Sequence, residues 1–195
     1  FNLPVDWDGN EVYLHFGGVN SAFYVWVNGE KVGYNEGAKT PAEFNITSYL
    51  KEGENEVSVE VYRWTDASYL QDQDFWRLSG IERDVYLFSK PKTSIQDFFL
   101  NATLDEEYEN GVLSANIILG NKERIKGDFQ VDLKIWDEEK IVYQQTKGIN
   151  LNNKEKDSLY MSDDIDRIKP WNAEHPNLYT VTITLSTAKE VLMAK

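Results

Sequence analysis

The sequence predicts an all-β protein, because apolar and polar side chains alternate along most of the chain. Turn signals separate these alternating runs, and no long run shows the apolar period of an amphipathic helix. The 195 residues suffice for one large domain or two modest domains, each with its own core.

The first strand is expected over residues 11–16, where Val12, Leu14 and Phe16 share one face. The next run begins at Ala22 and follows the same period. It ends at Asn28-Gly29, a pair that predicts a two-residue hairpin turn because both residues tolerate positive φ.

A short helical turn is expected around Tyr49, between two strands. Either Asn45 or Thr47 can cap it, and Gly53 can end it in the left-handed conformation. The strand that follows carries Val57, Val59 and Val61 on one face.

A domain boundary is predicted at Ser89–Ser94, a polar stretch with one proline and two lysines. The domains then span residues 1–91 and 92–195. Strands expected in the second domain are Ile95–Thr103, Val112–Leu119, Phe129–Trp136, Ile141–Thr146, Leu159–Met161 and Tyr179–Ser186. Turn signals at regular intervals between them are typical of an immunoglobulin-like β-sandwich.

The charge of the chain limits the partners it can bind. Twenty Lys and Arg against 33 Asp and Glu give a net charge of -13, which argues against nucleic acid and anionic membranes and favours a neutral partner. There are no cysteines, so disulfides and thiolate metal sites are excluded, and reducing and oxidising compartments both stay open.

The segment from residue 66 to residue 85 is too rich in charge for a plain connection. Its carboxylates can accept hydrogen bonds from sugar hydroxyls or ligate a hard cation through oxygen. The candidates are Asp66, Asp72 and Asp74. Arg77 and Arg83 can hold carboxylates in place by bidentate pairing. The alternative is an internally salt-bridged loop that serves only stability.

Other chemistry-bearing residues give weaker signals. His15 and His175 are the only histidines, and neither has a metal-ligand partner at a useful spacing, so structural roles are expected for both. Six tryptophans and eleven tyrosines are compatible with sugar stacking, but composition favours their use as core fillers.

Several motifs, in order along the chain, resemble the amino-terminal domain of glycoside hydrolase family 2 β-galactosidases. They are G-V-x-S-A-F at Gly18–Phe23, V-N-G-x-x-V-G-Y at Val27–Tyr34, P-A-E-F-x-I-T at Pro41–Thr47, G-E-N at Gly53–Asn55 and D-Q-D-x-W-R-x-S-G-I-x-R-D-V at Asp72–Val85. Residues 169–185 resemble the end of the family's immunoglobulin-like domain.

The resemblance implies a jelly-roll (galactose-binding-like) domain, then an immunoglobulin-like domain, then a (β/α)₈ barrel with the active site. It also implies that the jelly roll here is truncated at its amino terminus, with further strands ahead of Phe1. The parent enzyme would hydrolyse terminal β-D-galactosyl residues of lactose-type substrates with retention. Both catalytic glutamates of the family belong to the barrel, so no catalytic residue is expected in this chain.

The resemblance also assigns roles in the charged segment. Asp66 matches the aspartate that helps bind galactose and ligates a sodium ion beside it. Asp72, Asp74, Trp76 and Arg77 match the loop scaffold that holds it. A magnesium site is expected in the barrel, and a homo-oligomer is expected for the parent.

Two other interpretations stay open. The parent can be another family 2 glycosidase, such as a β-glucuronidase or a β-mannosidase, although Asp66 and the D-Q-D-x-W-R-x-S-G motif favour a galactosidase. The chain can instead be a stand-alone carbohydrate-binding module, which titration with galactose or lactose would test.

Overall fold

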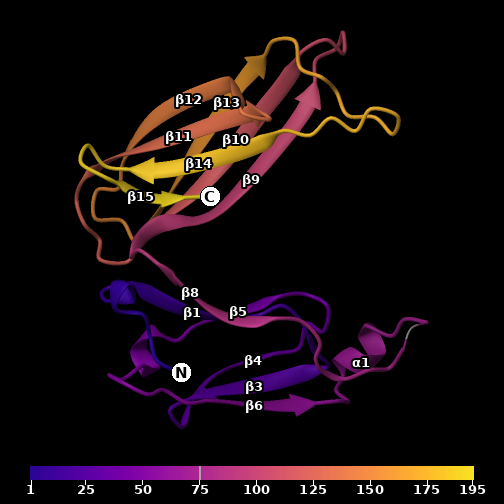
Figure 1. Ribbon diagram of the computed structural model, residues 1–195, viewed down its shortest axis with the longest axis vertical. Helices are drawn as coiled ribbons and strands as arrows, with labels where there is room; N and C mark the ends of the chain where they lie inside the picture. The colour runs from indigo at the N-terminus through magenta and orange to yellow at the C-terminus, as the bar shows by residue number, and fades with distance from the viewer. Residues whose placement is uncertain (75) are drawn as a thin grey trace. The chain divides into compact units, whose positions relative to one another are not determined.

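The computed structural model describes residues 1–74 and 76–195, and within them the all-β prediction is confirmed. These residues form fifteen strands, one four-residue α-helix and two 3-10 helices. The chain divides into two compact units, Phe1–Lys90 and Pro91–Lys195 (Figure 1). The predicted boundary, between residues 91 and 92, is one residue from this division.

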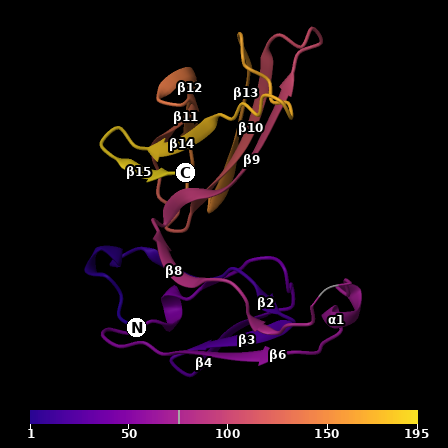
Figure 2. The ribbon, with the colours of Figure 1, turned by 45° about the vertical axis from the view of Figure 1, so that its right-hand side comes forward.

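The first unit contains two three-stranded sheets, in the orders β5-β1-β8 and β4-β3-β6, and a two-stranded ribbon β2-β7. Their strands are β1 (Glu11–Phe16), β2 (Val19–Asn20), β3 (Ala22–Val27), β4 (Glu30–Asn35), β5 (Ala42–Asn45), β6 (Val57–Tyr62), β7 (Gly80–Ile81) and β8 (Val85–Lys90). The helices are η1 (Val5–Trp7), η2 (Thr47–Tyr49) and α1 (Ala67–Leu70). In both views β8 lies in one layer of this unit and β3, β4 and β6 lie in the other (Figures 1 and 2).

The core of the first unit is built from the two faces that the alternation predicted. On β1, Val12, Leu14 and Phe16 are buried, and β3 buries Phe23 and its apolar neighbours. The opposite face of β1 carries the rings of residues 13 and 15, which stack on aromatic side chains of β8.

The predicted hairpin turn at Asn28-Gly29 is confirmed, with φ of 52° and 84° joining β3 to β4. The side-chain Nδ2 of Asn28 also donates to the Tyr49 carbonyl oxygen and to Asn55 Oδ1, both at 2.8 Å. The turn is therefore tied to the segment around η2 as well as to its own strands.

Neither Asn45 nor Thr47 is the cap of η2: Ile46 holds that position and forms no side-chain capping bond. Asn45 Oδ1 accepts from the Thr47 amide at 3.1 Å. The Thr47 hydroxyl is used elsewhere, accepting from the Val12 amide at 2.8 Å. Gly53 is left-handed, with φ of 79°, as predicted, but the helix has already ended at Tyr49. Gly53 instead forms part of a separate turn, which the Asn55 side chain closes by bonding the Lys51 amide and carbonyl.

The second unit contains two sheets, in the orders β13-β10-β9 and β12-β11-β14-β15. Their strands are β9 (Thr93–Leu104), β10 (Gly111–Asn121), β11 (Asp128–Asp137), β12 (Lys140–Asn150), β13 (Lys156–Ile165), β14 (Thr180–Ser186) and β15 (Val191–Ala194). Side chains from both sheets bury one core, which includes Ile117, Leu119, Leu133, Ile183 and Leu185.

Three strands of the second unit differ from the prediction. The strand predicted at Ile141–Thr146 continues to Asn150 in β12. The strand predicted at Leu159–Met161 extends over the whole of β13, and β15 was not predicted. Across the described ranges, 1–74 and 76–195, there is no helix of the length and apolarity that a bilayer crossing requires.

Candidate functional site

The charged segment begins with α1, which hydroxyl groups fix to the start of β3. Ser21 Oγ lies 2.6 Å from Thr65 Oγ1 and 3.2 Å from Ser68 Oγ. The Thr65 amide donates to Ser68 Oγ at 2.9 Å. Ser21 is buried, so these bonds attach the beginning of α1 to the interior of the first unit.

Asp66 is exposed and immediately precedes α1. Its backbone is helical, with φ of -57° and ψ of -34°, and its side chain forms no capping bond. Across residues 1–74 and 76–195, its carboxylate takes part in no hydrogen bond or ion pair. Its charge acts on Tyr34, whose pKa rises to about 12 through burial, a hydrogen bond to Glu36 and the charge of Glu36, with smaller effects from Tyr24 and Asp66.

A cavity of about 750 Å³ lies in the first unit behind the charged segment. Its lining includes Asn20, Lys39, Arg63, Trp76, Arg77 and Glu82. Asp72 also lines it, but Asp66 and Asp74 do not. The predicted binding carboxylate therefore lies outside this cavity, and most of the predicted scaffold lies around it.

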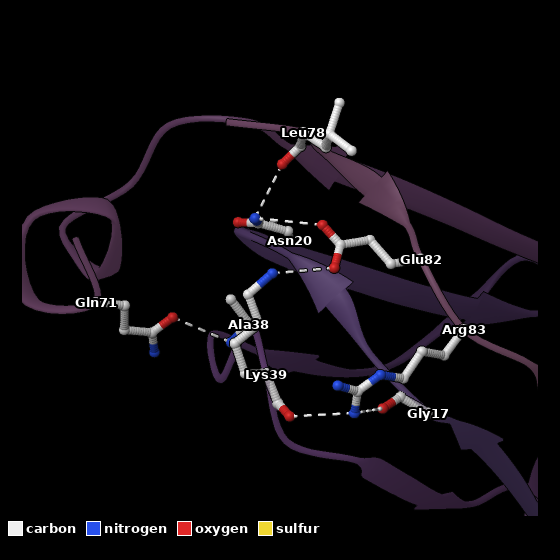
Figure 3. Close-up of polar contacts among 8 residues, drawn as sticks. All are labelled: Gly17, Asn20, Ala38, Lys39, Gln71, Leu78, Glu82 and Arg83. Atoms are coloured by element: carbon white, nitrogen blue, oxygen red, sulfur yellow. Dashed lines mark hydrogen bonds and ion pairs between the residues drawn. The ribbon is translucent and has the colours of Figure 1, made fainter. Parts of the chain in front are cut away.

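Glu82 holds together three segments at the wall of this cavity (Figure 3). Its Oε2 accepts from Lys39 Nζ at 3.0 Å, and its Oε1 accepts from Asn20 Nδ2 at 3.4 Å. The Asn20 amide group also donates to the Leu78 carbonyl at 2.9 Å. Hydrogen bonds from residues far apart in the sequence thus hold the part of the charged segment that leads into β8.

Arg83 does not pair with a carboxylate of the described loop, so that prediction was wrong. Its Nη1 donates to the carbonyl oxygens of Gly17 and Lys39, both at 3.3 Å (Figure 3). A Cβ atom at Gly17 would lie 3.0 Å from Arg83 Cβ, so the glycine makes room for the arginine. Sequence reasoning could not find these acceptors, because backbone carbonyls leave no residue-specific pattern.

The other predicted arginine pair does form. Arg77 Nη1 lies 2.7 Å from Asp72 Oδ1, and the hydrogen bond from Arg77 lowers the pKa of Asp72. Both side chains are about half exposed, so the pair orders the loop more than it stabilises the fold. Trp76 is 79% exposed beside them. Asp74 is exposed and has no partner within residues 1–74 and 76–195, and motif position Phe75 lies outside the described residues.

One residue important to this site lies outside the predicted set. Glu36 Oε1 accepts from the Ala67 amide at 3.2 Å, at the start of α1. These residues are 31 positions apart, and nothing local in the sequence marks Glu36 as the partner of the charged segment. Ser21, by contrast, belongs to the G-V-x-S-A-F motif, which could have indicated it.

The described part of the chain contains no group of three or more His, Cys, Asp or Glu residues that could hold a metal ion. His15 Nδ1 lies 3.1 Å from Glu43 Oε1, and its ring stacks on Tyr86 at 4.4 Å, which accounts for that histidine structurally. A hard cation such as sodium takes oxygen ligands. The unengaged Asp66 carboxylate fits one such ligand, and a complete site needs oxygen atoms from elsewhere.

Family comparisons match both units. Residues 1–91 match the sugar binding domain of glycosyl hydrolases family 2, and residues 93–195 match a second model of glycosyl hydrolases family 2. The chain belongs to glycosyl hydrolase family 2. The two β-sandwich units of this family 2 chain are therefore its amino-terminal sugar-binding domain and its immunoglobulin-like domain, as predicted.

The relatives of this family 2 chain are much longer than it is. It is 48% identical over 190 residues to a protein named beta-galactosidase from Priestia megaterium, covering 96% of the chain and 18% of the relative. It is 42% identical over 190 residues to a beta-galactosidase of Clostridium acetobutylicum, covering 95% of the chain and 20% of the relative. The crystal structure of a Bacteroides uniformis beta-glucuronidase matches with a TM-score of 0.91 at 24% identity, covering all of the chain and 24% of that structure.

Proposed function

We propose that this chain is the amino-terminal part of a β-galactosidase, in which it supports the catalytic barrel and completes the galactose pocket with Asp66. The observation that carries the proposal is the exposed Asp66 carboxylate, free of bonds to the described residues, at the start of an anchored helix. An exposed loop carboxylate is poorly explained by core packing, and binding residues often lie on loops held by a rigid scaffold.

The galactosidase assignment is supported by relatives that share 48% and 42% identity with the chain and bear that name. The beta-glucuronidase of similar fold shares only 24% identity, so it supports the fold and does not favour glucuronide substrates. The D-Q-D-x-W-R-x-S-G motif points the same way as the closer relatives.

In the proposed enzyme, hydrolysis with retention uses two barrel carboxylates about 5 Å apart, one as acid/base and one as nucleophile. This chain contributes to the binding step. Asp66 would accept hydrogen bonds from galactose hydroxyls and would provide one oxygen ligand to sodium, and Asp72, Trp76 and Arg77 hold the loop. When bound, sodium would supply a positive charge beside the sugar. Magnesium belongs to the barrel, outside this chain.

Asp66→Asn in the full-length enzyme tests the proposal. The variant keeps the size of the side chain but removes its charge, so activity should fall at least tenfold, or by about 1.4 kcal/mol of transition-state stabilisation. Its dependence on sodium should weaken, whereas the melting temperature should barely change. The measurements are kinetics across sodium concentrations and a thermal melt.

Glu30→Gln is the control, because Glu30 is an exposed carboxylate beside the hairpin turn of β3 and β4. It should leave both activity and melting temperature as they are. If Asp66→Asn has unchanged kinetics and a lower melting temperature, the proposed binding role is wrong and the loop serves only stability.

A further inference from the structure

The first amide of α1 is bonded by the side chain of Glu36, which directly follows β4. An aspartate directly before a helix ordinarily accepts a hydrogen bond from one of the first free amides. Asp66 has this position, yet its side chain forms no capping bond. The amides that such a cap would bond, those of Ser68 and Tyr69, donate to the carbonyl oxygens of Thr65 and Asp66. The Ala67 amide donates to Glu36 Oε1 at 3.2 Å.

Glu36 is itself held in place. It directly follows the end of β4 and is half-buried, and the Tyr34 hydroxyl forms a hydrogen bond with its side chain. Its own carbonyl accepts from Gln71 Nε2 at 3.3 Å. Gln71 Oε1 accepts from the Ala38 amide at 3.2 Å (Figure 3). The segment from residue 36 to residue 38 therefore forms hydrogen bonds with the residues at both ends of α1.

We infer that Glu36 is the positioning residue for Asp66, and this inference rests on the proposed binding role of Asp66. The Glu36 bond to the Ala67 amide fixes the backbone directly after Asp66. Because the Ser68 and Tyr69 amides already donate to backbone carbonyl oxygens, the Asp66 carboxylate stays outward and available to a ligand. A side chain that must bind a ligand from this position needs a backbone held by such supporting contacts.

The test compares three variants of Glu36 in the full-length enzyme. Glu36→Gln keeps an acceptor oxygen at the same reach and should stay within about twofold of the unmodified enzyme in KM. Glu36→Ala removes the acceptor, and Glu36→Asp keeps the charge but is one methylene too short. Both should raise KM for a chromogenic galactoside about tenfold, with a smaller effect on kcat.

Two further measurements separate positioning from general stability. Hydrogen exchange at the Ala67 amide should accelerate in the alanine and aspartate variants and not in the glutamine variant. Glu60→Ala is the control, because Glu60 forms a hydrogen bond with Tyr62 and both residues lie on β6, away from the Ala67 amide. It should leave both KM and Ala67 exchange unchanged.

Asp66→Asn, measured beside them, distinguishes the two possible failures. If Glu36 acts through Asp66, Glu36→Ala should raise KM no further in the Asp66→Asn background. An unaffected Asp66→Asn enzyme would overturn the proposed function. Two outcomes would overturn the positioning role alone, provided that Asp66→Asn itself is impaired. In the first, Glu36→Asp changes neither KM nor hydrogen exchange at Ala67. In the second, the effects of Glu36→Ala and Asp66→Asn on KM add fully in the double variant.

Discussion

Gly33 shows how a single residue shapes the core of the first unit. A Cβ atom at this position would lie 2.6 Å from Phe44 Cε1 and 2.8 Å from Phe44 Cδ1. The Phe44 ring packs edge-on against Phe16 and Phe23, with centroid distances of 6.1 and 5.9 Å. It cannot withdraw without disturbing both rings, so the strand position must lack a side chain.

Gly33→Ala should therefore destabilise the chain by about 1–3 kcal/mol, the usual cost of overpacking a core. Urea unfolding of the variant measures this loss. Gly148→Ala is the matched control, because its new Cβ would meet only the Phe129 carbonyl oxygen, at 3.9 Å. That change should stay within about 0.5 kcal/mol of the original stability. Equal stability of the two variants would contradict the argument.

At the same scale, the sequence predicts some site residues and not others. Asp72 and Arg77 lie five positions apart in one motif, and their ion pair was among the pairings expected. Glu36 and the acceptors of Arg83 could not be predicted, because those contacts join segments that only the tertiary fold brings together. The acceptor atom in each of these contacts lies in a distant segment of the chain, so a local sequence pattern does not identify it.

Among the elements, β11 and β12 are joined by a polar network around Asp132. Its Oδ1 accepts from the Thr146 hydroxyl at 2.7 Å and from the Gln144 amide at 2.9 Å. Lys134 Nζ lies 3.2 Å from its Oδ2. Burial raises the pKa of Asp132, but these hydrogen bonds and the charge of Lys134 outweigh burial and lower it below its usual value.

The lowered pKa fixes the direction of a pH effect. The ionised form of Asp132 is favoured in the folded chain, so its stabilisation is present above the unfolded-state pKa of about 3.9 and is lost as the pH falls through the lower folded-state pKa. Asp132→Asn should cost about 1 kcal/mol at neutral pH. The difference from the original chain should shrink below about pH 4.

Urea unfolding at several pH values checks this prediction, with Asp166→Asn as the control. Asp166 is exposed in the turn after β13, and its replacement should leave stability unchanged at each pH. A difference for Asp132→Asn that stays constant down to acid pH would mean that the network does not depend on the charge.

Element boundaries were predictable where alternation is strong and tertiary pairing adds little. On β10 every second residue from Gly111 to Ile117 is buried, and the predicted strand, Val112–Leu119, agrees with it. β13 contains Ser158, Ser162 and three aspartates, and only two of its residues are buried, so its sequence pattern is that of a polar loop over most of its length. Pairing with β10 along ten residues makes it a strand. The four-residue β15 likewise exists through its pairing with β14.

For the whole molecule, the fold class followed from periodicity, and the family followed from ordered motifs. The chain spans about a fifth of the length of the curated relatives it matches. The function of the proposed site therefore depends on oxygen atoms and carboxylates that this chain does not itself provide. Its net charge of -13 is consistent with the neutral sugar proposed as ligand.

The chain alone should not hydrolyse galactosides, because retaining hydrolysis needs two carboxylates about 5 Å apart on either side of the bond. By family resemblance both belong to the barrel. Asp66 by itself offers one charged acceptor without a surrounding pocket, since it lies outside the cavity of the first unit. Galactose should therefore bind weakly or not at all. Assays of the purified chain with a chromogenic galactoside, and an NMR titration with galactose that follows the Ala67 amide, measure both. Turnover that Asp66→Asn abolishes would prove the prediction wrong, because a contaminating enzyme would be indifferent to that substitution.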